Sequence, residues 1–128
     1  MIGYALVGSN DLTKAKAFYD DLLGSIGARS VMEHRSGGRI YAVTPGDPMF
    51  GVVAPVDEAP ATVGNGTMIS FSADSRQQVD KFHARALELG ATDEGCPGIR
   101  GNDPDGFYGG YFRDPDGNKL CVYRYGPK

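Results

Sequence analysis

The run Gly109-Gly110-Tyr111-Phe112-Arg113-Asp114-Pro115-Asp116-Gly117-Asn118-Lys119-Leu120 decides how the C-terminal part of the chain folds. Its centre, Asp114-Pro115-Asp116-Gly117, is a turn sequence, because proline presets its own φ and glycine accepts a positive φ. Apolar residues recur on both sides of this turn, and they predict strands at about 107–113 and 118–125. The run therefore predicts a tight β-hairpin.

Two segments upstream follow one plan. Residues 2–28 and 66–91 each contain a strand, a capping residue (Asp11 or Ser75), a helix and a terminal Gly-Ala pair. Their alignment places Tyr4 opposite Met68 and Phe18 opposite Phe82. The apolar residues that recur at helical spacing are Leu12, Ala15, Phe18, Tyr19, Leu22 and Leu23 in the first segment, and Val79, Phe82, Ala86 and Leu89 in the second. The shared order of elements indicates an internal duplication.

Further strands follow each helix. We expect them at about 29–35, 38–44 and 49–54 in the first half, and near 92–96 before the closing hairpin in the second. The plan is βαβββ twice. We therefore predict one α+β domain over residues 1–128, made of repeats 1–55 and 66–126 joined by a linker at 56–65.

Composition and charge narrow the class of protein. Of the 128 residues, 41% are hydrophobic and 23% are charged, which is typical of a globular chain. The net charge is −3 and no basic patch is present, so we expect no nucleic-acid partner. No apolar stretch approaches the roughly 20 residues that span a bilayer, so we expect no membrane partner. The absence of a targeting pattern and the two isolated cysteines favour a cytoplasmic location.

The duplicated plan together with residues 109–120 resembles the vicinal oxygen chelate superfamily, which includes glyoxalase I, bleomycin-resistance proteins and extradiol dioxygenases. Ser9-Asn10-Asp11-Leu12 and Ala17-Phe18-Tyr19 are similar to the family's opening. The resemblance covers essentially the whole chain. It implies that the two βαβββ units form a cup-shaped mixed sheet, and that the protein is a homodimer.

Metal-dependent relatives of this type carry His, Gln or Glu ligands on particular strands. Matched motif by motif, the ligand positions fall on Tyr4, Met68 and Cys121, with Phe50 or Val52 at the remaining position. A thioether is a poor ligand for the usual first-row metals, and one cysteine does not make a site. We therefore expect no metal cofactor, with a divalent metal as the alternative.

Strand alternation defines the expected ligand-binding cup, because successive side chains point to opposite faces. The face away from the helices should carry aromatic, hydroxyl and a few charged groups. The predicted cup residues are Tyr4, Leu6, Phe50, Val52, Met68, Ser70, Tyr111, Arg113, Cys121 and Tyr123. These side chains could instead fill the cup as solid core.

Other candidates have weaker signals. His34 and His83 lack a second ligand at metal spacing, and we interpret both as surface or boundary histidines. Cys121 is interpreted as a packed thiol rather than a nucleophile. The Gly- and Pro-rich loop 95–106 could form a lid in which Arg100 clamps an anion, but we interpret Arg100 as a solvated loop residue.

Three hypotheses for function follow. The first is a metal-free protein of the bleomycin-resistance type that binds a small, partly aromatic molecule. The second is a metal-dependent lyase, isomerase or dioxygenase with unusual ligands. The third is an interaction module whose cup is filled by its own side chains. The sequence leaves open whether any reaction is catalysed.

Overall fold

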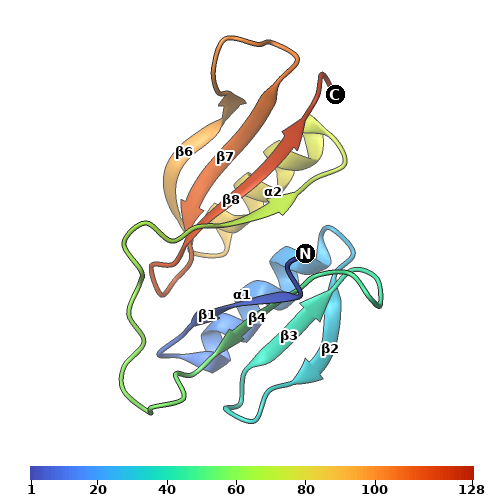
Figure 1. The fold of residues 1–128 in the computed structure, drawn as a ribbon. Helices are drawn as coiled ribbons and strands as arrows, with labels where there is room; N and C mark the ends of the chain where they lie inside the picture. Colours follow the sequence, from blue (N-terminus) through green and yellow to red (C-terminus); the bar gives the residue numbers. More distant parts are fainter. The chain divides into compact units, whose positions relative to one another are not determined.

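The computed structural model describes all residues from 1 to 128, and they form two compact units, Met1–Gly64 and Asn65–Lys128 (Figure 1). The elements of the first unit are β1 (Tyr4–Gly8), α1 (Leu12–Gly24), β2 (Arg29–Glu33), β3 (Arg39–Ala42) and β4 (Met49–Val53).

The second unit repeats this order. Its elements are β5 (Ile69–Ser72), α2 (Arg76–Glu88), β6 (Thr92–Ile99), β7 (Phe107–Arg113) and β8 (Lys119–Tyr125). The strand orders are β1-β4-β3-β2 and β5-β8-β7-β6, and in each sheet the first pair is parallel and the other two are antiparallel. The predicted α+β fold of two βαβββ units is confirmed.

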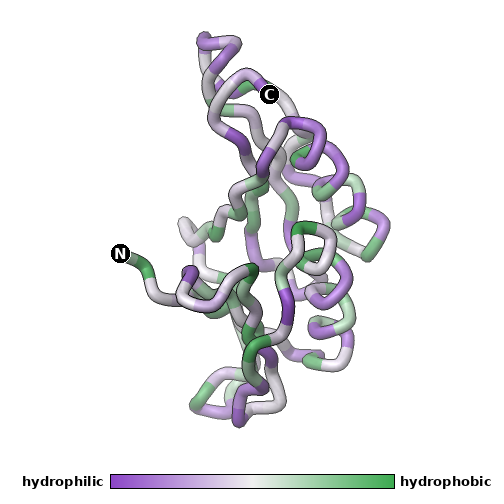
Figure 2. Tube along the Cα trace, turned by 90° about the vertical axis from the view of Figure 1, so that its right-hand side faces the viewer, coloured by the Kyte–Doolittle hydropathy of each residue, from purple (hydrophilic) through white to green (hydrophobic).

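Each helix begins at the capping residue that the sequence predicts. The Asp11 carboxylate accepts a hydrogen bond from the Lys14 amide at 3.1 Å, and Ser75 Oγ accepts one from the Gln78 amide at 3.1 Å. These bonds satisfy amides that have no partner within the first turn of a helix. In Figure 2, hydrophilic and hydrophobic residues alternate along both helices, as expected for helices with one buried face.

Each unit has its own apolar core between its helix and its sheet. In the first unit Tyr19 of α1 is fully buried, and its ring lies 5.0 Å from that of Phe50 on β4. In the second unit the ring of Phe82 on α2 lies 5.7 Å from Phe71 on β5 and 6.2 Å from Phe112 on β7. The helix-facing side of each sheet is therefore the core side.

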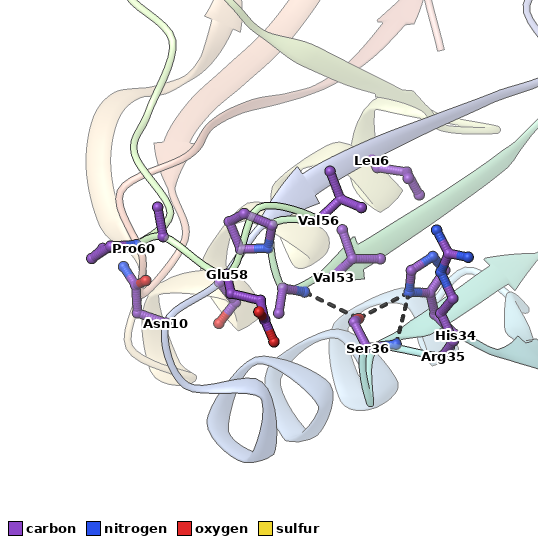
Figure 3. Close-up of a pocket in the computed structure, with 13 residues that line it drawn as sticks. Leu6, Asn10, His34, Arg35, Ser36, Val53, Val56, Glu58 and Pro60 are labelled. Carbon is purple, nitrogen blue, oxygen red and sulfur yellow. Dashed lines mark hydrogen bonds between the residues drawn. The ribbon is translucent and has the colours of Figure 1, made fainter.

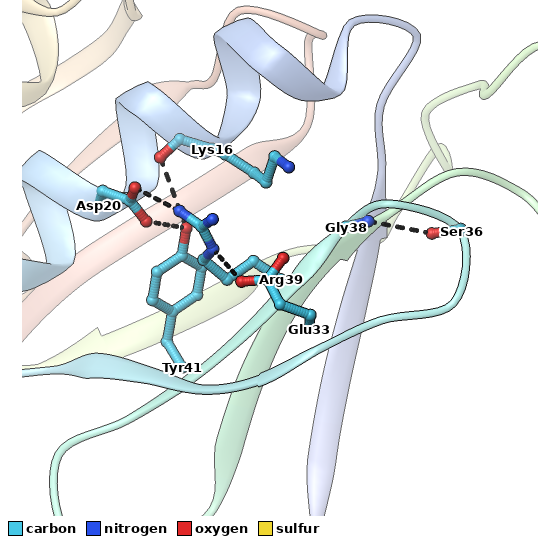
Figure 4. Close-up of polar contacts among 7 residues, drawn as sticks. All are labelled: Lys16, Asp20, Glu33, Ser36, Gly38, Arg39 and Tyr41. Carbon is cyan, nitrogen blue, oxygen red and sulfur yellow. Dashed lines mark hydrogen bonds and ion pairs between the residues drawn. The ribbon is translucent and has the colours of Figure 1, made fainter.

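A polar network also joins α1 to β3 (Figure 4). Asp20 accepts hydrogen bonds from the Tyr41 hydroxyl at 2.6 Å and from Arg39 Nη1 at 2.5 Å, and Arg39 Nε donates to Glu33 at 2.6 Å. Burial, followed by the bond to Asp20, raises the pKa of Tyr41. The phenol therefore stays protonated while it donates to the carboxylate.

The predicted turn between β7 and β8 is built by Asp114. Its carboxylate accepts the amides of Asp116 and Asn118 at 3.0 and 2.9 Å and the Asn118 side-chain amide at 2.9 Å. Gly117 has a φ of 92°, which a residue with a side chain rarely adopts. The turn prediction from residues 109–120 is confirmed.

Two segments make contacts that the sequence did not predict. Residues 56–64 belong to the first compact unit, and Ala61 is held there by Asn10, which donates to its carbonyl at 3.0 Å and accepts from its amide at 2.7 Å. Part of the expected loop 95–106 is strand, because β6 runs to Ile99, and the Arg100 amide donates a hydrogen bond to the Phe107 carbonyl. Neither helix is long and apolar enough to cross a membrane.

Candidate functional site

We call the side of each sheet that faces away from its helix the open face. Residues paired directly across two strands share a face. In the first unit Ala5 pairs with Phe50 and Val7 with Val52, and the Phe50 ring packs against Tyr19 of α1. Tyr4 and Leu6 alternate with Ala5 and Val7, so they lie on the open face.

The expectation that Phe50 and Val52 face the ligand is wrong. Their side chains are 7% and 0% exposed and belong to the core beneath α1. The β1–β4 register places Gly51 opposite Leu6 instead, so the open-face positions of β4 are Met49, Gly51 and Val53. Sequence could not fix this register, and a slip of one residue exchanges the two faces of a strand.

Tyr4 and Leu6 are accessible, with 61% and 40% of their surface exposed. A Cβ added to Gly51 would lie 2.7 Å from Leu6 Cδ2, so the glycine allows the Leu6 side chain to lie directly on β4. The open face near Leu6 is therefore apolar, and residue 51 contributes no side chain to it.

A pocket of about 1000 Å³ adjoins this face (Figure 3). It lies wholly within the first unit, between the end of β4, the β2–β3 turn and the segment after β4. Its lining residues are Leu6, Ser9, Asn10, His34, Arg35, Ser36, Val53, Ala54, Pro55, Val56, Glu58, Ala59 and Pro60. Of the predicted cup residues, Leu6 lines this pocket. The others were not predicted as cup residues. His34 and Arg35 fall at the end of the predicted strand 29–35, and Val53 and Ala54 at the end of the predicted strand 49–54. Val56, Glu58, Ala59 and Pro60 fall in the predicted linker.

Ser36 organises one end of the pocket. Its Oγ accepts the amides of Gly38 at 3.3 Å and Ala54 at 3.2 Å, and lies 2.9 Å from His34 Nδ1 (Figure 3). The Ser36 amide also donates to Nδ1 at 3.2 Å. Ser36 thereby fastens the β2–β3 turn to β4 and holds the His34 ring in place. The predicted strands 29–35 and 38–44 leave room for this turn, but nothing in the sequence indicates these contacts.

The open face of the second unit carries Ser70, Tyr111, Cys121 and Tyr123. Cys121 lies between Ser70 on β5 and Tyr111 on β7, and it is fully buried. Burial raises the pKa of the Cys121 thiol, although Ser70, Arg100 and Lys119 oppose the shift. A thiol held protonated in this way is a poor nucleophile and metal ligand.

The cations near this face are engaged with Tyr111 or with backbone. Arg100 lies over the Tyr111 ring at 5.3 Å and donates to Cys96 O at 2.7 Å, and Lys119 Nζ lies 5.9 Å from the same ring. Tyr123 stacks on Phe107 with ring centroids 5.4 Å apart. The aromatic residues of this face therefore already have partners.

Two further predicted cup residues lie at the margins of the second sheet. Arg113 forms an ion pair with Glu94 and donates to Gly117 O at 2.9 Å, so its guanidinium stabilises the end of the hairpin. Met68 lies one residue before β5 and is 41% exposed. Neither side chain is placed in the pocket of the first unit.

His83 is not the surface or boundary histidine that we expected. It is 3% exposed, and its Nε2 lies 3.0 Å from Tyr111 O and 3.2 Å from the Asp93 carboxylate. Because both partners are acceptors, Nε2 carries the proton. The residue follows Phe82 on the buried side of α2, and this position was the available signal for burial.

The side chains present do not fit a metal site. No group of three or more His, Cys, Asp and Glu residues is placed to hold an ion. Of the predicted ligand positions, Tyr4 and Met68 supply poor donors, Phe50 and Val52 supply none, and Cys121 is buried with a raised pKa.

The comparisons with known proteins agree with the fold. A model of the Glyoxalase/Bleomycin resistance protein/Dioxygenase superfamily matches residues 1–122. A glyoxalase/bleomycin resistance protein from Albidiferax ferrireducens T118 is 41% identical, with a TM-score of 0.85 and coverage of 97% of this chain and 98% of that chain. No curated protein matches the chain.

More distant structures share the same arrangement. A lactoylglutathione lyase from Agrobacterium tumefaciens is 26% identical, with a TM-score of 0.67 over 97% of this chain and 92% of that chain. A glyoxalase/bleomycin resistance protein/dioxygenase family enzyme from Burkholderia phytofirmans PsJN is 21% identical, with a TM-score of 0.74 over 96% and 97% of the two chains. At the latter identity the likeness shows the fold alone.

Proposed function

Because the chain belongs to the glyoxalase/bleomycin resistance protein/dioxygenase superfamily, we propose that it binds a small, partly aromatic molecule, without a metal ion, in the pocket of its first unit. The observation that carries this proposal is the pocket of about 1000 Å³ that Leu6 lines. A volume of this size accommodates a small organic ligand.

The walls of the pocket have the chemistry that such a ligand needs. Leu6, Val53 and Val56 form an apolar middle, and Val56 is 87% exposed in the free protein. Covering such a side chain with a ligand removes apolar surface from water at about 25 cal/mol per Å². Polar groups at the two ends of the pocket can fix the orientation of the ligand, as they do in small-molecule sites.

The metal-free part of the proposal rests on the side chains at the predicted metal-ligand positions, which are poor ligands. The rival hypothesis, a metal-dependent lyase, isomerase or dioxygenase, requires an ion that these residues are poorly suited to hold. We expect purified, dialysed protein to contain substoichiometric transition metal by elemental analysis. About one metal per chain, lost in a Cys121→Ser variant, would contradict the metal-free proposal.

Binding is tested by thermal denaturation with a panel of small aromatic compounds. A ligand at a hundred times its dissociation constant stabilises the fold by about 2.7 kcal/mol, which for a domain of this size raises Tm by roughly 5–10 °C. Leu6→Asp should abolish the shift, because it places a charge on the apolar wall. Val31→Asp is the matched control, since Val31 is 49% exposed on β2 and lies outside the pocket.

The outcomes separate the remaining hypotheses. If no compound raises Tm, the interaction-module hypothesis replaces ligand binding. If Val31→Asp abolishes the shift as fully as Leu6→Asp, the ligand does not occupy this pocket.

Assembly and location are further parts of the proposal. We expect a homodimer, as the family resemblance implies, and light scattering on purified protein tests it. Both cysteines are free thiols, which supports a reducing, cytoplasmic environment. Fractionation of cells that express the protein tests the location.

A further inference from the structure

We infer that the pocket of the first unit selects an organic monocarboxylate, whose carboxylate is bound by His34 and Arg35 and whose apolar body lies on Leu6, Val53 and Val56. This inference rests on the proposed function and names the chemical class of the ligand. It follows from the hydrogen-bonding state of His34, the unpaired charge of Arg35 and the position of Glu58.

His34 presents a donor to the pocket. Its Nδ1 accepts the Ser36 amide at 3.2 Å, so Nδ1 carries a lone pair, and the proton of the neutral ring lies on Nε2. Ser36 Oγ already accepts two backbone amides, which leaves its own hydroxyl proton to donate to Nδ1 at 2.9 Å. The turn thus fixes the tautomer as well as the ring.

The Nε2–H group of His34 is accessible to a ligand. It makes no hydrogen bond within the protein, and no buried side-chain nitrogen or oxygen in the structure lacks a partner. Nε2 must therefore reach open space, and His34 lines the pocket. It offers a single donor in a defined direction.

Arg35 adds an uncompensated positive charge beside this donor. Arg39 on β3, outside the pocket, is bound by Asp20 and Glu33, whereas Arg35 forms no ion pair or hydrogen bond. Both residues line the pocket, and their side chains overlap in the view of Figure 3. A guanidinium and a ring N–H together match the two oxygens of a carboxylate.

The opposite end of the pocket has the opposite charge. In Figure 3 the side chains of Val53 and Val56 lie between the His34 and Arg35 end and the Glu58 end, and Leu6 lies near the His34 and Arg35 end. Glu58 has a φ of 63°, a left-handed conformation that is uncommon for a residue with a side chain and that costs free energy to hold. Its carboxylate repels a second anionic group on the ligand, so the pocket favours monocarboxylates over dicarboxylates.

The test compares acids with their neutral amides. The probes are phenylacetate, 3-phenylpropionate, cinnamate and indole-3-acetate, each with its primary amide, together with 3-(4-carboxyphenyl)propionate as a dicarboxylate. Calorimetric titration gives the affinities. We expect at least one acid to bind about tenfold or more tightly than its amide, since a hydrogen bond to a charged group contributes that much. The dicarboxylate should bind more weakly than 3-phenylpropionate.

Two variants test whether Arg35 causes the preference for acids over amides. Arg35→Gln should lower the acid-to-amide affinity ratio about tenfold and leave the amide affinity unchanged. Arg29→Gln is the matched control, because Arg29 is an exposed arginine on β2 outside the pocket, and it should leave the ratio unchanged. In amide NMR spectra, the acid should shift the signals of Ser36 and Ala54.

The results distinguish this inference from the proposed function. Acids and amides that bind equally well overturn the inference and leave the proposed function standing. A panel in which no compound binds overturns both. Acid binding that shifts the signals of Arg100 and Tyr111 instead, and that survives Arg35→Gln, overturns the assignment to this pocket.

Discussion

Replacing Ser36 by alanine should destabilise the protein and also impair its pocket. The hydroxyl makes three contacts at once, with the amides of Gly38 and Ala54 and with His34 Nδ1. Ser36 links the β2–β3 turn to the residue that follows β4. One oxygen atom therefore holds together two segments that are distant in the sequence.

The magnitude follows from the environment of those partners. Gly38 is buried, so its amide loses an acceptor that water replaces poorly, at a cost of about 1–3 kcal/mol. Ala54 is half-buried and lines the pocket, so water can solvate its amide at a smaller cost. We expect the free energy of unfolding to fall by about 1–3 kcal/mol, which lowers Tm by roughly 2–11 °C at this chain length.

Chemical denaturation with a matched control measures this effect. Ser30→Ala removes an exposed serine on β2 and should change the free energy of unfolding by less than about 0.5 kcal/mol. Ser36→Thr keeps the hydroxyl and should recover part of the loss. A Ser36→Ala protein as stable as the Ser30→Ala protein would refute the reasoning, because the three contacts would then contribute nothing.

Other expected outcomes follow from single contacts. Gly38→Ala should destabilise the fold strongly in denaturation experiments, since its Cβ would overlap a backbone carbonyl oxygen of β4, whereas Gly24→Ala, with nothing within 4 Å, should be tolerated. Because the pKa of Tyr41 is raised in the folded state, the folded protein keeps a proton that the unfolded chain loses above about pH 10. The free energy of unfolding should therefore fall as pH rises above about 10, and it should fall less steeply in Tyr41→Phe. A thiol reagent should modify exposed Cys96 in the folded protein and buried Cys121 only after unfolding; rapid modification of both thiols would contradict the burial and raised pKa of Cys121.

Much of the fold could be predicted from local sequence, because local interactions determine it. Asp114 and Gly117 specify the β7–β8 turn through bonds and a φ angle that involve only five consecutive residues. Asp11 and Ser75 cap their helices through amides three residues away. Apolar spacing then identified the buried face of each helix, and the duplication of these signals indicated two units of one plan.

The pocket depended on tertiary structure. The pairing of β1 with β4 turned Phe50 and Val52 toward α1 and left Leu6 beside Gly51. A shift of one residue in this pairing would reverse the two faces of β4. The register is set by the neighbouring strands, so the sequence of β4 alone does not determine which face is buried. The segment after β4 became a pocket wall, and Ser36 oriented His34, through contacts between residues far apart in the chain. Sequence spacing carries no signal for such contacts, since they form only when the packed sheet brings the segments together.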